Sequence, residues 1–229
     1  MKYLLFFITI IASGVAGCSK SKGADPVCRI SEVTSTSSAI KEFSYDKNGK
    51  LQQVKQGTTQ YNFEYSGNKI VILQTIDGEF AQKQIVTLMA NGLAESVRTE
   101  QDPSGTPWYN TLYTYEGERL IRITMVYSNT SHTNVTTYNW ENGNPVSYND
   151  GSRIVMMTYY SDRRHDRQLD IADYSFWEYL RPKNLLKSYI IGPDKLIHTH
   201  SFDSDGKVIS LSIADGSRTS IYNYKYECR

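Results

Sequence analysis

The sequence predicts an all-β protein, an antiparallel up-and-down meander curled or closed into a barrel-like structure, with one short helix or lid near residues 171–180. A hairpin unit recurs along the chain, and apolar and polar residues alternate between its turns. A single stretch departs from this alternation. The chain of 229 residues is close to the length that one all-β domain fills without dividing, roughly 200–250 residues.

The hairpin unit is clearest at residues 43–54, where the aromatic strand end Phe43-Ser-Tyr-Asp46 precedes Asn48-Gly49 and a strand that opens with Leu51. Related stretches occupy residues 63–70, 113–120, 138–146 and 201–208. Asn-Gly and Asp-Gly pairs tolerate the positive φ angles that tight hairpin turns require. The further turn signals along the chain predict more than ten strands.

Alternation between the turns places aromatic and aliphatic residues on one face of each strand and polar residues on the other. This pattern is typical of an antiparallel sheet with one covered face. The covered face supplies the candidates for lining a ligand site, which are Tyr61, Phe63, Tyr65, Ile121, Ile123, Met125, Tyr127, Tyr222 and Tyr224. The 18 tyrosines fit two interpretations, packing on pleated strands or contact with a ligand in a cavity.

The interruption lies between Asp162 and Lys187. Residues 161–170 are densely charged, and apolar groups then recur at spacings of three and four until Arg181-Pro182. These spacings predict a short helix that closes one end of the sheet structure. Its lid candidates are Tyr174, Phe176, Trp177 and Leu180.

The first residues read as an export signal, because one lysine precedes an apolar run too short to span a bilayer of about 30 Å. Val15-Ala-Gly-Cys18 resembles the bacterial lipobox, in which the cysteine is acylated. We therefore expect a lipoprotein signal peptide at 1–17, a lipidated tether at 18–26 and a single domain at 27–229, with Cys18 as the lipid anchor. An ordinary signal peptide with a chance cysteine is the alternative.

Acylation of Cys18 would leave Cys28 and Cys228, which lie near the two ends of the domain. In an exported protein this pair favours a disulfide, with two free thiols as the alternative. The terminal strands of an open meander lie at opposite edges, so a bond between them would require the sheet to close.

Charge and motifs exclude several functions. The formal net charge is +1, which leaves no basic field for nucleic acid. His198 and His200 share a strand face, but we expect solvated histidines on an exposed face and no metal. Asp162, Asp166 and Asp170 lack the spacing of a calcium loop. The sequence predicts no cofactor and no enzyme, although only a fold can reveal a pair of hydrolytic carboxylates.

A wider resemblance rests on the lipobox, Cys28-Arg-Ile-Ser31, the segment 181–187 after the predicted helix, and the closing strand at 222–228. Together these look like a family of uncharacterised Bacteroidota lipoproteins, and Tyr45-Asp46 to Leu51 is similar to YD repeats. The resemblance implies a porin-like or barrel-like meander anchored to the outer membrane of a bacterial cell envelope, with lipid binding proposed for some members. Lys20 and Lys22 replace the usual acidic residues after the anchor, so the membrane face stays open.

Two functions follow. The first is a non-enzymatic binding module for a lipid or other apolar ligand, because more than about eight strands closing into a barrel tend to leave a lumen. The alternative is a structural or interaction lipoprotein that docks a membrane partner or a glycan through an exposed aromatic sheet face. A membrane-spanning porin is disfavoured, because Glu64, Arg122 and Lys225 would face lipid.

Overall fold

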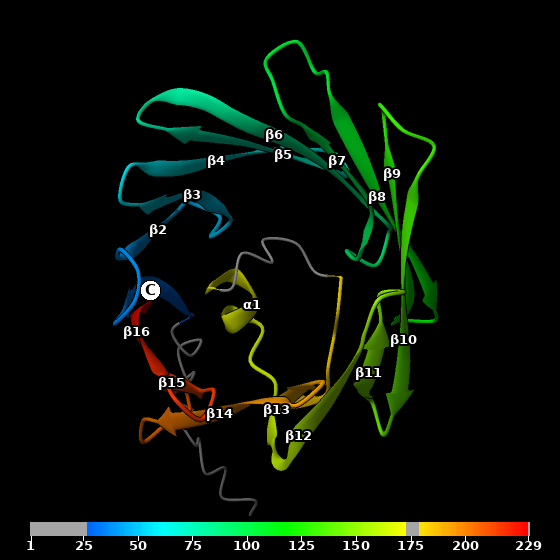
Figure 1. Cartoon of the computed structure of the whole chain (residues 1–229). Helices are drawn as coiled ribbons and strands as arrows, with labels where there is room; N and C mark the ends of the chain where they lie inside the picture. The colour runs from blue at the N-terminus through cyan, green and yellow to red at the C-terminus, as the bar shows by residue number, and fades with distance from the viewer. Residues whose placement is uncertain (1–26, 173–178, 229) are drawn as a thin grey trace, which may run out of the picture.

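Sixteen strands form one closed barrel in the computed structural model, which describes residues 27–172 and 179–228. Each strand runs antiparallel to the next along the chain, and the last pairs with the first (Figure 1). The predicted up-and-down meander is confirmed, including its closure. The elements are β1 (Cys28–Ser35), β2 (Lys41–Tyr45), β3 (Leu51–Gln56), β4 (Thr59–Ser66), β5 (Lys69–Ile76), β6 (Glu79–Leu88), β7 (Ala94–Glu100), β8 (Trp108–Glu116), β9 (Arg119–Tyr127), β10 (Thr133–Glu141), β11 (Asn144–Asn149), β12 (Ile154–Arg164), α1 (Gln168–Ala172), β13 (Asn184–Ile191), β14 (Asp194–Phe202), β15 (Val208–Ala214) and β16 (Thr219–Cys228).

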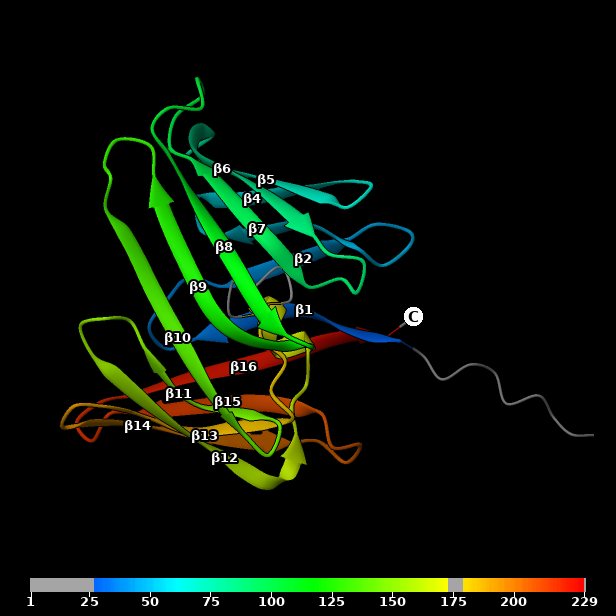
Figure 2. The ribbon, with the colours of Figure 1, turned by 90° about the vertical axis from the view of Figure 1, so that its right-hand side faces the viewer.

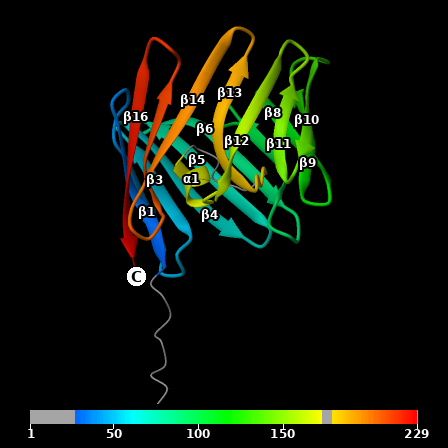
Figure 3. The same cartoon turned by 90° about the horizontal axis from the view of Figure 1, so that it is seen from below.

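The hairpin connections divide between the two ends of the barrel. We call the end that carries Cys28 and Cys228 the terminal rim, and the opposite end the far rim. Even-numbered strands run toward the terminal rim, where β1 begins beside the end of β16 (Figure 3). Most connections at the terminal rim are tight turns, but the one between β12 and β13 spans residues 165–183, which we call the insert.

The strands present two different faces, as the alternation predicted. Cross-strand pairing puts Tyr61 opposite Gln74 and Phe63 opposite the buried Ile72, so this face points into the lumen. Glu64, Arg122 and Lys225 are exposed on the other face. The strands are tilted relative to the barrel axis (Figure 2), as closure of a sheet into a barrel requires. No helix in the described ranges is long and apolar enough to cross a membrane.

One predicted inward position, Ile121, lies at a bulge. Register slips between Thr114 and Tyr115, so that Tyr115 pairs with Leu120 while Thr114 pairs with Arg122. Ile121 is the extra residue of this bulge, and Leu120 beside it is fully buried. Ile123, Met125 and Tyr127 keep the predicted face, because they pair with inward residues of β8.

The recurrent aromatic residue at the strand ends has a shared role at the terminal rim. The hydroxyl of a tyrosine, or the indole N–H of a tryptophan, donates a hydrogen bond to a backbone carbonyl near the start of the preceding strand. The pairs are Tyr45 Oη to Ile30 O (2.7 Å), Tyr65 Oη to Leu51 O, Tyr115 Oη to Ala94 O and Tyr226 Oη to Val208 O (2.8 Å each), and Trp140 Nε1 to Leu120 O (2.7 Å). The repeat therefore ties each hairpin to its neighbour and buries the aliphatic residue that follows the turn.

The turn that follows Tyr45 shows why the repeat needs its aspartate and glycine. Asp46 Oδ1 accepts hydrogen bonds from the amides of Asn48 and Lys50, both at 2.8 Å. Gly49 has a φ of 77°, and a Cβ there would collide with the guanidinium of Arg29. Asp203 makes the same contacts in the turn between β14 and β15, with the amides of Asp205 and Lys207.

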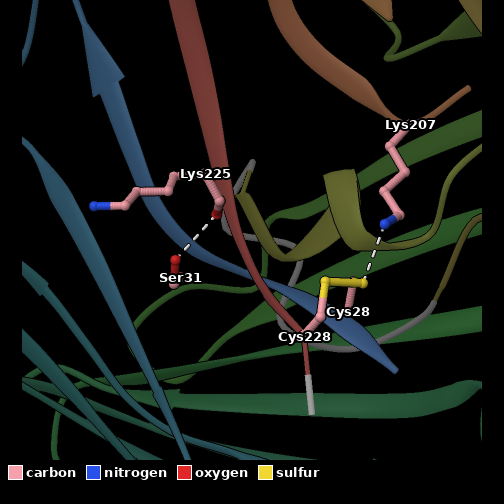
Figure 4. The surroundings of a disulfide bond; sticks show 5 residues. All are labelled: Cys28, Ser31, Lys207, Lys225 and Cys228. Atoms are coloured by element: carbon pink, nitrogen blue, oxygen red, sulfur yellow. Dashed lines mark hydrogen bonds between the residues drawn. A yellow bond between two sulfur atoms is a disulfide. The ribbon is translucent and has the colours of Figure 1, made fainter. Parts of the chain in front are cut away.

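A disulfide closes the barrel seam, as predicted. Cys28 and Cys228 face each other across β1 and β16, with Cα atoms 3.9 Å apart at a sequence separation of 200. The Lys207 ammonium lies 3.1 Å from Cys28 Sγ, and the Ser31 hydroxyl donates to the carbonyl of Lys225 (Figure 4). The seam is thus held by backbone pairing, side chains and a covalent bond.

The predicted short helix is present but begins earlier than expected. α1 covers Gln168–Ala172, and Tyr179 and Leu180 are not helical. It lies inside the ring of strands (Figure 1), where Leu169 and Ala172 are buried in the same apolar cluster as Ile30, Phe63 and other inward residues. The lid candidates Tyr174, Phe176 and Trp177 lie outside the described residues.

Candidate functional site

The insert enters and leaves the barrel between β12 and β13. At its base the amide of His165 donates to the carbonyl of Lys183 at 3.1 Å. Asn184 is buried beside this base, where its side-chain oxygen accepts a hydrogen bond from the side-chain amide of Asn144 of β11 and its backbone N–H donates to Asn144 Oδ1. These contacts hold the two ends of the insert together at the terminal rim.

The first half of the insert attaches to the wall formed by the start of the chain. Leu169 and Ala172 are 7% and 2% exposed, and both pack in the main apolar cluster. Lys41, itself only 7% exposed, donates from its ammonium to the carbonyl of Ala172 at 2.7 Å. β2 therefore holds the C-terminal end of α1 inside the lumen.

The end of the insert attaches to a different part of the wall. The Tyr179 ring lies 5.6 Å, between centroids, from the ring of Tyr113 on β8. Arg181 bonds Glu118 in the turn between β8 and β9 and the carbonyl of Asn91 in the turn between β6 and β7. The described residues of the insert therefore contact two separate parts of the wall, β2 and the region from β6 to β9.

A cavity of about 320 Å³ lies between the insert and the wall formed by β12–β16. Its size falls at the lower end of the range found for ligand sites, about 300–1,000 Å³. The insert lines it with His165, Leu169, Asp170, Tyr179, Leu180 and Pro182, and the strands with Tyr159, Leu185, Leu186, Tyr189, His198, His200, Leu211 and Tyr224. The lining is therefore mostly apolar and aromatic, with a few polar groups.

The two histidines of β14 correct the sequence-based interpretation. His198 and His200 face the lumen, and His198 is only 9% exposed, so they are not solvated on an outer face. Burial lowers the pKa of His198 to about 4, and burial also lowers the pKa of His200. Both imidazoles are therefore neutral at neutral pH. Among the residues that the structure describes, no group of three potential ligand side chains is arranged to hold a metal.

The insert contributes a polar pair to the same cavity. His165 Nε2 lies 2.9 Å from Asp170 Oδ1, and both side chains are mostly shielded from solvent. An ionised carboxylate only accepts hydrogen bonds, so the imidazole is the donor. The proximity of His165 also contributes to the lowered pKa of His200, which shows that the polar groups of insert and wall lie near one another.

Of the predicted ligand-lining residues, Tyr224 borders the cavity, and so does the lid candidate Leu180. The predicted residues of β4, β9 and the start of β16 face the lumen but are not among the residues that line this cavity. The sequence interpretation missed His165, Asp170, Tyr159, Tyr189 and the lining leucines other than Leu180. For His198 and His200 a signal was present, because they alternate with polar residues on the same strand face as Leu196 and Phe202.

A second hollow of about 360 Å³ lies over the same strands, lined by Thr158, Tyr159, Lys187, Ser188, Ile190, Lys195 and Ile197. Met156 pairs with Ile190 on the face opposite the buried Val155 and Met157, so this face points outward. Ile154, Met156 and Ile197 are 59%, 47% and 44% exposed. β12 to β14 therefore carry an aliphatic patch on their outer face, which we call the outer patch.

Comparisons with known proteins bear on the fold. No family model matches the chain. No curated protein matches it either. Among solved structures, a porin-like protein from Bacteroides uniformis matches with a TM-score of 0.63 and 14% identity, over 86% of this chain and 96% of that one. A porin-like protein from Bacteroides vulgatus matches with a TM-score of 0.60 and 13% identity, over 88% and 99% of the two chains. The chain therefore has the fold of these porin-like proteins.

Proposed function

We propose that the protein is a non-enzymatic binding module that holds a lipid or other apolar ligand in the lumen cavity. The observation that carries this proposal is the cavity itself, a space of about 320 Å³ with five leucines and four tyrosines among its lining residues. A closed barrel has no free strand edges, so the wall around such a space is rigid and continuous. A rigid apolar cavity of this size suits a small apolar molecule.

The polar outer face of the barrel and its short strands favour a position outside the hydrocarbon core of a membrane. A membrane-spanning strand needs about 9–11 residues, and its outward side chains are apolar. β2 has five residues, and β3 and β11 have six each. Glu64, Arg122 and Lys225 are exposed on the outer face, and the aromatic residues turn inward. This arrangement supports a water-facing outer wall around an apolar interior.

We further propose that acylated Cys18 tethers the barrel to the outer membrane. Cys28 opens β1 at the terminal rim, ten positions after Cys18, so a tether would hold this rim toward the membrane. The full chain should partition with membranes and incorporate radiolabelled palmitate, whereas Cys18→Ala should lose both the label and most of the membrane association. Equal association of the two forms would contradict the anchor.

Ligand binding is tested with the full chain and an uncharged, environment-sensitive fluorescent probe, N-phenyl-1-naphthylamine. Leu186→Trp fills part of the cavity and should weaken probe binding at least about tenfold, since a bulky side chain and the probe compete for one space. Ile197→Trp adds the same bulk on the outer patch and should leave probe binding unchanged. Leu180→Trp, outside any strand, is a second cavity variant should Leu186→Trp misfold. Absence of probe binding by the wild type, together with a lipid-free native mass, would contradict the proposal.

The outer patch supports a second candidate, docking of a membrane partner. Ile154, Met156 and Ile197 are exposed, and Lys187 and Lys195 flank them. An aromatic docking face is not supported, because the aromatic faces of β4 and β16 line the lumen. If docking occurs, the Cys18→Ala form should keep some membrane association, and Ile154→Asp with Ile197→Asp should abolish it. No residual association of Cys18→Ala would contradict docking.

A further inference from the structure

Several polar side chains of the lumen cavity lie close together, and not all of their described polar atoms have a hydrogen-bond partner. His165 and Asp170 form one hydrogen-bonded pair at 2.9 Å, and His200 lines the same cavity, where burial and the nearby His165 lower its pKa. His200 packs edge-on against the ring of Tyr160, at 5.8 Å between centroids. Its ring is thereby fixed beside the cavity.

Two buried side-chain atoms lack a hydrogen-bond partner in the described part of the chain, His200 Nδ1 and Gln168 Oε1. His200 lines the cavity, and Gln168 lies on α1, adjacent in sequence to the cavity-lining Leu169. Buried polar groups in proteins nearly always have partners, and an exception often marks the place of a water or a ligand. The unpartnered nitrogen therefore points to a ligand that carries its own hydrogen-bonding group.

The charges around the cavity restrict what that group can be. None of the described residues that line it is Lys or Arg, and its carboxylate, Asp170, is paired with His165. Lys41 donates to the carbonyl of Ala172, and the Arg163 guanidinium lies over the ring of Phe202 at 4.5 Å from its centroid. A buried ligand carboxylate would thus sit near Asp170 without a cation, which is costly.

We propose that the cavity selects an uncharged lipid with a hydroxyl group, such as a fatty alcohol or a monoacylglycerol, over a fatty-acid carboxylate. The hydroxyl group meets His200 and the His165–Asp170 pair, and the apolar chain lies against the leucines. A hydroxyl group both donates and accepts, so it satisfies His200 Nδ1 in either tautomer and can also donate to Asp170. This inference rests on the proposed function, since it names the ligand class of the same cavity.

The test measures how dodecanol and dodecanoate displace N-phenyl-1-naphthylamine from the full chain at neutral pH. The two ligands have the same chain length and differ in the charge of the head group. Dodecanol should bind at least about tenfold more tightly, and His200→Leu should weaken dodecanol binding about tenfold relative to dodecanoate binding by the same variant, the effect of one lost hydrogen bond. His132→Leu, in the exposed loop between β9 and β10, is the matched control and should match the wild type.

Asp170→Asn gives an independent reading if His200→Leu does not fold. It keeps an acceptor oxygen for His165 but removes the negative charge, so dodecanoate should gain affinity relative to dodecanol. Equal binding of dodecanol and dodecanoate by the wild type would overturn the inference and leave the proposed function intact. Failure of the probe and of both ligands to bind would overturn the inference and the proposed function together.

Discussion

The ammonium group of Lys41 donates a 2.7 Å hydrogen bond to the carbonyl oxygen of Ala172, 131 residues further along the chain. Lys41 is the first residue of β2, and Ala172 is the last residue of α1. The carbonyls at the end of a helix have no partner within the helix. Lys41 therefore supplies a partner for one of these carbonyls at a position where water has little access.

Replacing Lys41 should loosen the insert. Lys41→Met keeps most of the apolar stem but leaves the carbonyl of Ala172 without this donor, which costs about 1–3 kcal/mol. We expect hydrogen exchange in Gln168–Ala172 to accelerate roughly 5- to 150-fold, if exchange follows local opening. Trypsin should also cut faster after Arg163, Arg164 and Arg167. Lys55→Met, on the outer face of β3, is the control, and equal exchange in the two variants would contradict the role of Lys41.

The tyrosine hydroxyls of the terminal rim should each contribute to stability. Tyr226→Phe removes the donor to the carbonyl of Val208 while keeping the ring, so the free energy of unfolding should fall by about 1 kcal/mol. Tyr222 lies on the same strand and face, and in the described part of the chain its hydroxyl makes no hydrogen bond. Tyr222→Phe should therefore change stability less. Urea denaturation measures both variants, and equal losses would show that the hydroxyl bond is not the source.

The same hydroxyls should make the barrel sensitive to alkali. Burial raises the pKa of Tyr45 and of Tyr65 to about 12 from the usual value of 10.0 for tyrosine, and burial also raises the pKa of Tyr115 and Tyr226. The folded state therefore holds these protons more tightly, and the stability gained is complete below about pH 10 and is lost as the pH rises toward 12. Ionisation of these four tyrosines and loss of the β signal in circular dichroism should therefore occur together. The difference in tyrosinate absorbance between the wild type and Tyr45→Phe or Tyr65→Phe isolates the rim tyrosines, and their ionisation near pH 10 in an intact barrel would contradict this.

The sequence was sufficient for the wall of the barrel. Alternation in β4, from Tyr61 to Tyr65, gave its inward face, and the Asp-Gly and Asn-Gly pairs gave the turns, because both signals are local. Cys28 and Cys228 added the one long-range constraint, which required closure. A bulge is harder to foresee, because its extra residue, here Ile121, interrupts the strict alternation on which such an assignment of faces depends.

The contents of the lumen depend on contacts that the sequence does not encode locally. The charged stretch at 161–170 shows no sign of burial in its sequence, yet His165 and Asp170 pair inside the barrel and Leu169 is buried. Alternation shows that His198 and His200 share a face, but it does not say which face is covered. The partner of α1, Lys41, could be identified only once the barrel had brought β2 and the insert together.

The disulfide should stabilise the seam between β1 and β16. It closes a loop of 200 residues, for which the chain-entropy model gives roughly 5 kcal/mol, an upper value because measured effects often fall short. Reduction should lower the free energy of unfolding and accelerate hydrogen exchange in β1 and β16 before other strands. Cys28→Ala with Cys228→Ala should reproduce the reduced protein and should not respond to reductant. Two alkylatable thiols in the unreduced wild type would contradict the bond.

Acid should destabilise the barrel through His198. Burial lowers the pKa of His198 to about 4, from the usual value of 6.5 for histidine, because a charged imidazole is costly beside Leu211 and Tyr189 in the cavity. The unfolded chain therefore binds the proton more tightly. The stability that neutral His198 allows is complete above about pH 6.5 and is lost as the pH falls toward 4.

His198→Phe cannot take up a proton, so its free energy of unfolding should fall less steeply over this range. His200, whose pKa is also lowered, should leave a residual slope. His132→Phe, in the exposed loop between β9 and β10, should follow the wild type. Urea denaturation from neutral pH down to about pH 4 measures all three proteins, and parallel curves for His198→Phe and the wild type would mean that His198 is not held neutral by the barrel.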